Sequence, residues 1–360
     1  MSAPSTTDLV TFDPAERPHL IVMVDAEEEF QWEQFSRSAN SVQNIAAQMR
    51  AQEILERFGI KPTYLVDYPV AAQPEGYEPL KALLDAGRCD IGAQLHPWVN
   101  PPMREQITLH NTFPGNLPAA LESEKIQQLT QAITKNFGIK PTVFRAGRYG
   151  AGPNTTEALI ANGYTIDASV MPLADFSAQG GPDYTNAPAV PYWRDHEHRL
   201  LEIPTTVGLV GLLARAARGS VHTLLSAASA SMRLPGLMSR AGLLERIRLT
   251  PEGISLDEAK RLTMSLFRQG HRLFVLSYHS SSLLVGGTPY VANEADITKI
   301  LQWLDGYCRF FFGGLGGFAT QPETILHVAR RQIGTIPARI PTEPNFNASL
   351  VPAVEYVQSS

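Results

Sequence analysis

The hexapeptide FGIKPT occurs twice in the chain, at Phe58–Thr63 and again at Phe137–Thr142. Each copy follows a helical pattern of apolar residues and precedes an apolar run. Gly59 and Gly138 suit the left-handed residue that ends a helix, and the proline three residues later forbids further helix before the next strand. The repeat therefore predicts a helix-to-strand joint that is used twice, in a chain that alternates helices with strands.

The periodicity of the apolar residues extends this alternation along the chain. Helices are expected at Val42–Phe58, Pro79–Ala86, Glu122–Phe137, Asn154–Asn162, Leu256–Gly270 and Glu294–Tyr307. Strands are expected at His19–Val24, Thr63–Asp67, Asp90–His96, Thr142–Arg145, Tyr164–Ser169, Glu202–Thr205 and Leu273–Tyr278. Strands joined by helical crossovers pair in parallel, which favours a complete or distorted β/α barrel of the α/β class. An open, doubly wound sheet is less favoured, because no glycine-rich phosphate-binding pattern follows the first strand.

The chain divides into a barrel domain and two flanking segments. We expect an N-terminal arm at 1–17, the barrel at 18–332 and an extended tail at 333–360. Within the barrel domain, segment 207–250 carries six arginines against one acid, Glu245, and its apolar residues recur at helical spacing. This pattern predicts a basic helical insertion, which suits contact with an anionic membrane, a cover over an anionic substrate, or a helix packed on the barrel.

Charge and composition exclude several classes of protein. Lys and Arg total 30 and Asp and Glu 35, a net charge of −5, which argues against a nucleic-acid partner. The first residues lack the pattern of a signal peptide, and no apolar run reaches the roughly 18 residues of a membrane span, so a cytoplasmic location is expected. The two cysteines, Cys89 and Cys308, indicate neither a disulfide framework nor a zinc cluster.

Ionisable residues stand where predicted strands give way to loops. Parallel strands of a β/α barrel place their carboxyl ends at one mouth, where such enzymes carry their chemistry. The side chains expected to share that pocket are Asp25, Glu27, Asp67, His96, Arg145, Asp167 and His279.

The motifs VDAEEEF, FGIKPTYLV, FRAGRYG, IDASV and LSYH follow one another in the order found in one known family. From about Pro18 to Arg331 the chain resembles the polysaccharide deacetylases, also called the NodB-homology group or carbohydrate esterase family 4. The resemblance implies a metal-assisted hydrolase that removes an acetyl group from a carbohydrate. It implies Asp25 as catalytic base, Arg145 as the residue that orients it, His279 as catalytic acid and Asp167 as the residue that orients the histidine.

The chain departs from the family in its metal-binding motif. The family has two histidines four residues apart, whereas DIGAQLHPW offers one, His96. The resemblance then implies a divalent ion, zinc or similar, held by Glu27 and His96, with Asp67 as a further candidate beside Asp25. Gln94 and Trp98 share the strand face of His96 if the strand stays extended.

Residues in the loops near the mouth suit a sugar or a glycolipid-linked sugar as substrate. Trp98 and Tyr149 can stack on a pyranose, and Asn111 and Arg148 can bind its polar groups. The resemblance suggests an intermediate of surface-polysaccharide assembly.

Two other functions stay open from the sequence. The same barrel could hydrolyse a non-sugar amide such as a cyclic ureide or imide, with Arg145 and Arg148 holding a carboxylate. It could also be a non-catalytic protein that binds a carbohydrate or a partner, because one metal-binding histidine is missing. The oligomeric state also stays open.

Overall fold

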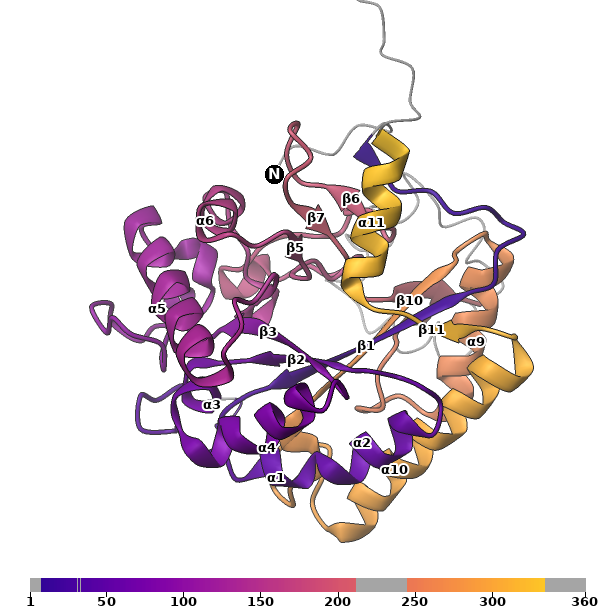
Figure 1. The fold of residues 1–360 in the computed structure, drawn as a ribbon, viewed down its shortest axis with the longest axis horizontal. Helices are drawn as coiled ribbons and strands as arrows, with labels where there is room; N and C mark the ends of the chain where they lie inside the picture. The colour runs from indigo at the N-terminus through magenta and orange to yellow at the C-terminus, as the bar shows by residue number, and fades with distance from the viewer. Residues whose placement is uncertain (1–7, 31, 33, 212–244, 334–360) are drawn as a thin grey trace, which may run out of the picture.

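The computed structural model describes residues 8–30, 32, 34–211 and 245–333. Its main sheet has nine strands in the order β10-β1-β2-β3-β4-β5-β7-β6, with β11 also paired to β1. The strand bounds are β1 His19–Ala26, β2 Thr63–Val66, β3 Asp90–Leu95, β4 Val143–Ala146, β5 Ile166–Asp167, β6 Tyr192–Trp193, β7 Leu201–Glu202, β10 Leu273–His279 and β11 Phe318–Ala319. All neighbours pair in parallel except β6 and β7, and the sheet curls into a distorted, incomplete barrel (Figure 1). The predicted α/β fold is confirmed.

Helices cover the outer face of this sheet (Figure 1). The bounds of these outer helices are α1 Asn44–Ala47, α2 Met49–Glu56, α3 Tyr68–Ala72, α4 Pro74–Asp85, α5 Ala119–Phe137, α6 Thr155–Asn162, α9 Leu256–Arg268 and α10 Glu294–Cys308. Helix α11, Pro322–Ile333, instead packs with the inward-facing residues. In β1, Leu20, Val22 and Val24 pack against the outer helices, whereas Ile21 and Met23 face an inner apolar cluster. This alternation is the two-residue period of a strand, and it determines which side chains reach the interior of the barrel.

Helix α11 closes the inner cluster and was not predicted. Ile325, Leu326 and Ala329 of α11 are buried in the same apolar cluster as inward-facing residues of β1, β5 and β10. The N-terminal segment adds Val10 to the same cluster, and Thr11 exchanges hydrogen bonds with the side chain of Gln332. The described part of the N-terminal arm therefore lies against the barrel.

The repeated joint has the predicted geometry. Gly59 has φ 70° and Gly138 has φ 79°, and β2 and β4 begin within five residues of them. Helix bounds differ more: the predicted helix Val42–Phe58 is two helices, α1 and α2, and α4 begins at Pro74 rather than Pro79. Pro74 lies in the first turn of α4, where a proline is tolerated, so its presence did not indicate where the helix begins.

The predicted basic helical insertion at 207–250 is wrong for the residues that the structure describes at its two ends. Val207–Val210 forms strand β8, which pairs antiparallel with β9, Glu245–Arg248. Gly208 lies against Leu262 and Leu266 of α9, so contact with that helix favours a strand over the helix suggested by apolar spacing. Residues 212–244, and residues 334–360 of the predicted tail, lie outside the described residues.

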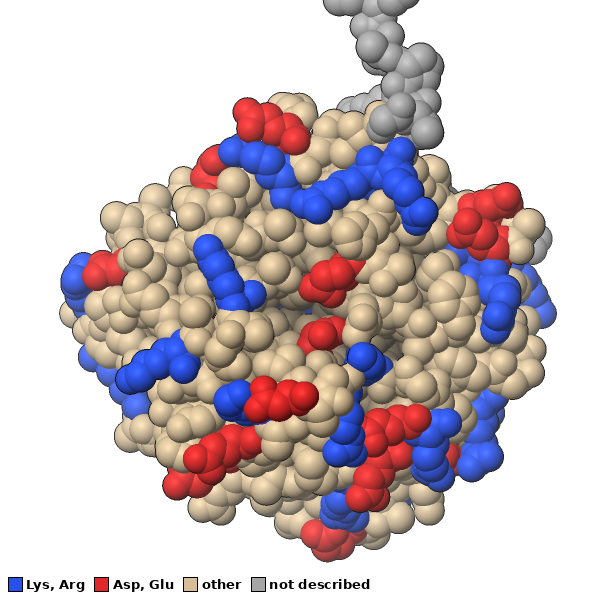
Figure 2. All heavy atoms as spheres, viewed as in Figure 1, with Lys and Arg blue, Asp and Glu red and all other residues tan. Residues whose placement is uncertain are grey.

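Charged residues are intermingled on the face of the molecule that Figure 2 shows. Blue and red side chains alternate there, in keeping with a net charge of −5 and without an extended basic surface on that face. Within the described ranges, no helix combines the length and the apolar character needed to cross a membrane.

Candidate active site

A cavity of about 330 Å³ lies at the carboxyl ends of the parallel strands. It brings together seven of the residues predicted from the sequence, namely Asp25, Glu27, His96, Arg145, Arg148, Tyr149 and His279. The strand period explains several of them, because Asp25 continues the inward-facing positions Ile21 and Met23 of β1, and His279 continues Leu273 and Val275 of β10. The inner apolar core therefore gives way to a polar site along the same face.

Asp25 and His279 lie opposite one another on paired strands. Their backbones are register partners in the β1–β10 ladder, and His279 Nε2 is 3.9 Å from Asp25 Oδ2. Arg145 Nη1 donates to the other oxygen, Asp25 Oδ1, at 2.5 Å. Arg145 is itself fixed, since it also donates to the Ala168 carbonyl and the Ser277 hydroxyl. The buried guanidinium holds the carboxylate so that Oδ2 faces the imidazole.

Glu252 orients His279. Its carboxylate oxygens are 3.0 and 2.9 Å from His279 Nδ1, and Oε1 accepts the backbone N–H of His279 at 2.8 Å. Ser282 also donates to Oε1, and Arg248 Nη2 lies 3.3 Å from Oε2. Burial acts to raise the pKa of Glu252, but His279 and Arg248 outweigh it and lower the pKa to about 2. An ionised carboxylate therefore places the proton of the neutral ring on Nδ1.

Asp167 was predicted in that role, and the structure places it elsewhere. It belongs to β5, where the inward-facing neighbours are Ile166 and Ala168, so its side chain points to the opposite face. There it accepts from Arg194 Nη1 at 2.7 Å, and the same nitrogen donates to Glu202 at 2.9 Å. Asp167 is thus part of a buried ion-pair cluster beside the site.

Removing the cation of this cluster should destabilise the fold. Replacing Arg194 with methionine leaves the buried carboxylates of Asp167 and Glu202 without their shared partner. The expected loss in the free energy of unfolding is about 3–5 kcal/mol, measured by urea denaturation. The matched control is Arg199→Met, whose ion pairs lie at the surface and whose loss should change stability little. Equal stability of the two variants would contradict a structural role for the cluster.

Acidic groups surround the Nδ1 side of His96. Glu28 Oε2 lies 2.8 Å from Nδ1, Trp98 Nε1 donates to Glu28 Oε1 at 2.7 Å, and Asp67 Oδ2 lies 3.9 Å from Nδ1. Asp67 also accepts the backbone N–H groups of Glu28 and Val70. Burial raises the pKa of Glu28 to about 7, against the hydrogen bonds that lower it, and burial together with Glu28 raises the pKa of Asp67.

The Nε2 side of His96 faces the cavity with Glu27 and Gln94. Nε2 is 3.6 Å from Glu27 Oε2 and 3.2 Å from the Gln94 amide nitrogen, which is 3.4 Å from the same Glu27 oxygen. Ligand atoms of a tetrahedral site with bonds of about 2.1 Å are roughly 3.4 Å apart, so these separations fit a divalent ion. Gln94 Oε1 is buried without a partner among the described residues, and exchanging the amide oxygen and nitrogen would present a ligand oxygen.

The charges of this group also fit a cation. Burial raises the pKa of Glu27 well above its usual value, and the nearby carboxylates of Glu28, Asp25, Asp67 and Glu252 raise it further. Burial lowers the pKa of His96 to about 4, so the imidazole is neutral, the form that binds metal. The Glu28 carboxylate on Nδ1 corresponds to the carboxylate partner that metal-ligating histidines usually have.

A second set of possible ligands, Glu28, Asp67 and Nδ1 of His96, has its atoms within 4.8 Å of one another. Glu28 is occupied by His96 and Trp98, and Asp67 by two backbone N–H groups. These hydrogen bonds favour a supporting position behind His96 for Asp67, which was predicted as a metal ligand.

Aromatic rings form much of the cavity wall. Phe30, Phe35, Phe113, Tyr149 and Phe176 line it together with Trp32, whose ring packs edge-on against His279 at a centroid distance of 4.7 Å. Trp98, predicted to stack on the sugar, is instead buried behind the site, with its ring stacked on His96. Asn111, predicted as a substrate contact, lies in the loop after β3, where its amide donates to the Gln106 carbonyl.

Glu252 and Gln94 are the site residues that the strand-end reasoning missed. Glu252 follows β9, a strand that was not predicted because it lies within the predicted helical insertion, so the position of Glu252 at a strand end was hidden. Gln94 was placed on the face of His96 but was not considered as a ligand, because the family pattern concerns histidines four residues apart and Gln94 lies two residues from His96. The alternation of side chains between the two faces of β3 was the sequence signal that could have identified Gln94 as a site residue.

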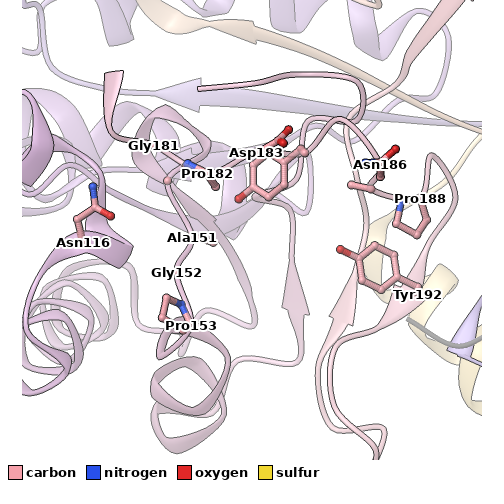
Figure 3. Close-up of a pocket in the computed structure, with 13 residues that line it drawn as sticks. Asn116, Ala151, Gly152, Pro153, Gly181, Pro182, Asp183, Asn186, Pro188 and Tyr192 are labelled. Carbon is pink, nitrogen blue, oxygen red and sulfur yellow. The ribbon is translucent and has the colours of Figure 1, made fainter. Parts of the chain in front are cut away.

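A second cavity, of about 530 Å³, is lined by residues 150–153 and 181–184 (Figure 3). Its walls carry Tyr184, Tyr192, Asn116, Asn186 and several prolines, and Asp183 is the one acidic or basic group among the described residues that line it. The Tyr184 hydroxyl donates to the Tyr149 carbonyl, which links this wall to that of the first cavity. The second cavity is larger, but the acid–base groups lie in the first.

No family model and no curated protein sequence matches the chain. Among solved structures, a protein from Mycobacterium smegmatis assigned as a polysaccharide deacetylase matches with a TM-score of 0.52 at 14% identity, over 91% of this chain and 96% of that one. A family 4 carbohydrate esterase from Streptomyces lividans in complex with acetate matches with a TM-score of 0.39 at 12% identity, over 84% and 92%. A family 4 pseudoenzyme from Bacillus anthracis matches with a TM-score of 0.40 at 11% identity, over 87% and 66%. The likeness to the first shows a shared fold, so the resemblance inferred from the motifs is confirmed at the level of the fold.

Proposed function

We propose that this protein, which has the fold of polysaccharide deacetylases, hydrolyses an acetyl group from a carbohydrate. The observation that carries the proposal is the pair Asp25 and His279, whose facing atoms are 3.9 Å apart at one end of a cavity. Each is fixed by a partner of opposite charge, Arg145 for the carboxylate and Glu252 for the imidazole. A base and an acid held side by side are what acyl-group hydrolysis requires.

The two groups divide the proton transfers. Asp25 Oδ2 accepts the proton of the attacking water, because its other oxygen is bound by Arg145. His279 Nε2 donates a proton to the leaving amine or alkoxide, because Nδ1–H is held by the ionised Glu252. Glu252 replaces Asp167 as the positioning residue for the histidine.

Glu27, Gln94 and Nε2 of His96 are the residues that would hold a divalent ion such as zinc. When bound, such an ion polarises a carbonyl oxygen and makes a water nucleophilic at neutral pH. The Glu28 carboxylate holds the His96 ring in the orientation that this needs.

Metal content tests this set. The wild-type protein, purified without chelators and reconstituted with zinc, is expected to hold about one ion per chain by mass spectrometry. Glu27→Gln and His96→Ala should each retain at least about tenfold less, because each removes a ligand from a shell of three protein atoms. The control is His110→Ala, a histidine hydrogen-bonded to Asn116 outside the cavity, which should leave the metal content unchanged. Absence of metal from the reconstituted wild type would refute the site.

The cavity suits a sugar residue. Its aromatic walls offer stacking surfaces, and the Tyr149 hydroxyl is buried without a partner among the described residues, so a substrate hydroxyl could satisfy it. A sugar or glycolipid-linked sugar of surface-polysaccharide assembly fits this chemistry. Contact with a membrane through 207–250 and a cytoplasmic location stay predictions.

A substrate panel tests the proposed function. Acetate release is measured with metal-loaded protein on N-acetylhexosamines, their oligomers and O-acetylated xylan. Ammonia release and ring opening are measured on cyclic ureides and imides. Acetate from at least one carbohydrate supports the proposal, and turnover of the ureides or imides alone would replace it with amide hydrolysis. Binding of the sugars without turnover of any compound would favour a non-catalytic binding protein.

A further inference from the structure

Arg148 is directed into the cavity by a strained turn. The 3-10 turn Gly147–Tyr149 follows β4, and Arg148 and Tyr149 have φ of 55° and 57°, in the left-handed region that non-glycine residues seldom adopt. A Cβ on Gly147 would lie 2.4 Å from the Leu95 carbonyl and 2.5 Å from the His96 ring, so the turn packs directly against the proposed metal-binding strand. Backbone strain of this kind persists only where the surrounding structure holds it in place. Residues strained in this way cluster at functional sites.

The guanidinium of Arg148 has only neutral neighbours among the residues that the structure describes. It donates to the Thr112 hydroxyl and the Gln179 amide oxygen, and it lies over the Phe113 and Phe35 rings at 4.1 and 5.0 Å. Within the described ranges no carboxylate forms an ion pair with it. Arg145, by contrast, pairs with Asp25, and Arg248, the other arginine that lines the cavity, pairs with Glu252.

Several donors of Arg148 remain available. A guanidinium carries five N–H groups, and the two hydrogen bonds to Thr112 and Gln179 use two of them. The side chain is half-buried between aromatic rings, where a cation without a partner is unfavourable and an incoming anion is bound more strongly than in water. Carboxylate and phosphate groups match the geometry of the guanidinium fork.

We propose that the carbohydrate bound in this cavity carries an anionic group, a carboxylate or a phosphate ester, and that Arg148 binds it. This inference rests on the proposed function, because it assumes that the acetyl group lies at Asp25 and His279 while the anionic group lies at Arg148. The structure thus favours an acidic sugar over a neutral one.

Binding of matched sugars tests the inference. Calorimetry compares N-acetylglucosaminuronate with its methyl ester, which removes the charge and keeps the sugar. It also compares N-acetylglucosamine 6-phosphate with N-acetylglucosamine. The wild type is expected to bind at least one anionic member about tenfold more tightly than its neutral counterpart, as one charge-assisted contact provides. The pair that shows the difference identifies the anion as carboxylate or phosphate.

The variants separate Arg148 from general electrostatics. Arg148→Gln keeps hydrogen-bonding capacity and should abolish the preference, whereas Arg148→Lys should keep part of it. Arg309→Gln makes the same change in net charge at an exposed ion pair with Asp305 and should keep the full preference. Circular dichroism confirms that each variant is folded. Equal binding of the paired sugars, binding of none of them, or a preference that survives in Arg148→Gln would overturn the inference.

Acetate release on the same sugars distinguishes the two proposals. An anionic preference lost in Arg148→Gln, without acetate release from any sugar, would overturn the deacetylase proposal and leave Arg148 as an anion-binding residue. Acetate release from neutral sugars with no anionic preference would overturn the inference about Arg148 alone.

Discussion

The substitution Asp25→Asn is expected to lower kcat for acetate release by about a thousandfold, which is the effect of losing a general base. The amide of Asp25→Asn has nearly the shape of the carboxylate, and its oxygen can still accept from Arg145. It cannot take the proton of the attacking water. The measurement is kcat at saturating substrate in metal-loaded protein, on whichever acetylated sugar the substrate panel identifies.

Two controls accompany Asp25→Asn. Its metal content should stay close to that of the wild type, because Glu27, Gln94 and His96 are untouched. Asp183→Asn makes the same chemical change in the second cavity, where Asp183 accepts from Thr185, and should leave kcat within about twofold. A kcat for Asp25→Asn within tenfold of the wild type, in folded and metal-loaded protein, would rule out Asp25 as the base.

Replacing Glu252 with glutamine is expected to lower kcat by about a hundredfold or more. The carboxylate, whose pKa is lowered to about 2 by its ion pairs despite burial, is ionised at every pH at which the enzyme would work. It stabilises the protonated imidazole and fixes its tautomer. Glutamine keeps the shape of the side chain but not its charge, and the loss is measured as kcat at saturating substrate in folded, metal-loaded protein.

Asp167→Asn separates this role from the one predicted at first. Asp167 pairs with Arg194 on the other face of β5, so this variant should lose stability and keep a kcat close to that of the wild type. The opposite pattern, an unchanged kcat in Glu252→Gln and a lowered kcat in Asp167→Asn, would return the positioning role to Asp167. Glu252→Asp serves as the conservative variant and should restore part of the activity.

The sequence predicts a residue at this site well where strand-end position and strand parity agree. Asp25, Arg145 and His279 occupy strand ends and fall on the same parity as inward-facing apolar residues such as Met23 and Val275. Asp167 has the strand-end position but the opposite parity, since its neighbours Ile166 and Ala168 face inward. One residue of register therefore decides whether a side chain reaches the cavity or the layer behind it.

Other features depend on contacts between distant segments, which apolar periodicity does not report. Strands β8 and β9 stabilise each other across residues 212–244 and pack on α9, so neither is recognisable from its own few residues. The position of Glu252 just after β9 is therefore predictable only once this pairing is known. Trp98 is the type of residue that stacks on sugars. Its indole N–H, however, donates to the buried carboxylate of Glu28, which lies at the end of another strand.

The most direct test of the central claim is acetate release in ¹⁸O-labelled water by the wild type, Asp25→Asn and His279→Ala, each loaded with metal. The account predicts that the wild type releases acetate carrying one ¹⁸O atom, in equal amount with the free amine or hydroxyl, and that both variants lose this activity. Absence of acetate from every acetylated carbohydrate tested with the wild type, or undiminished labelled acetate from both variants, would contradict it.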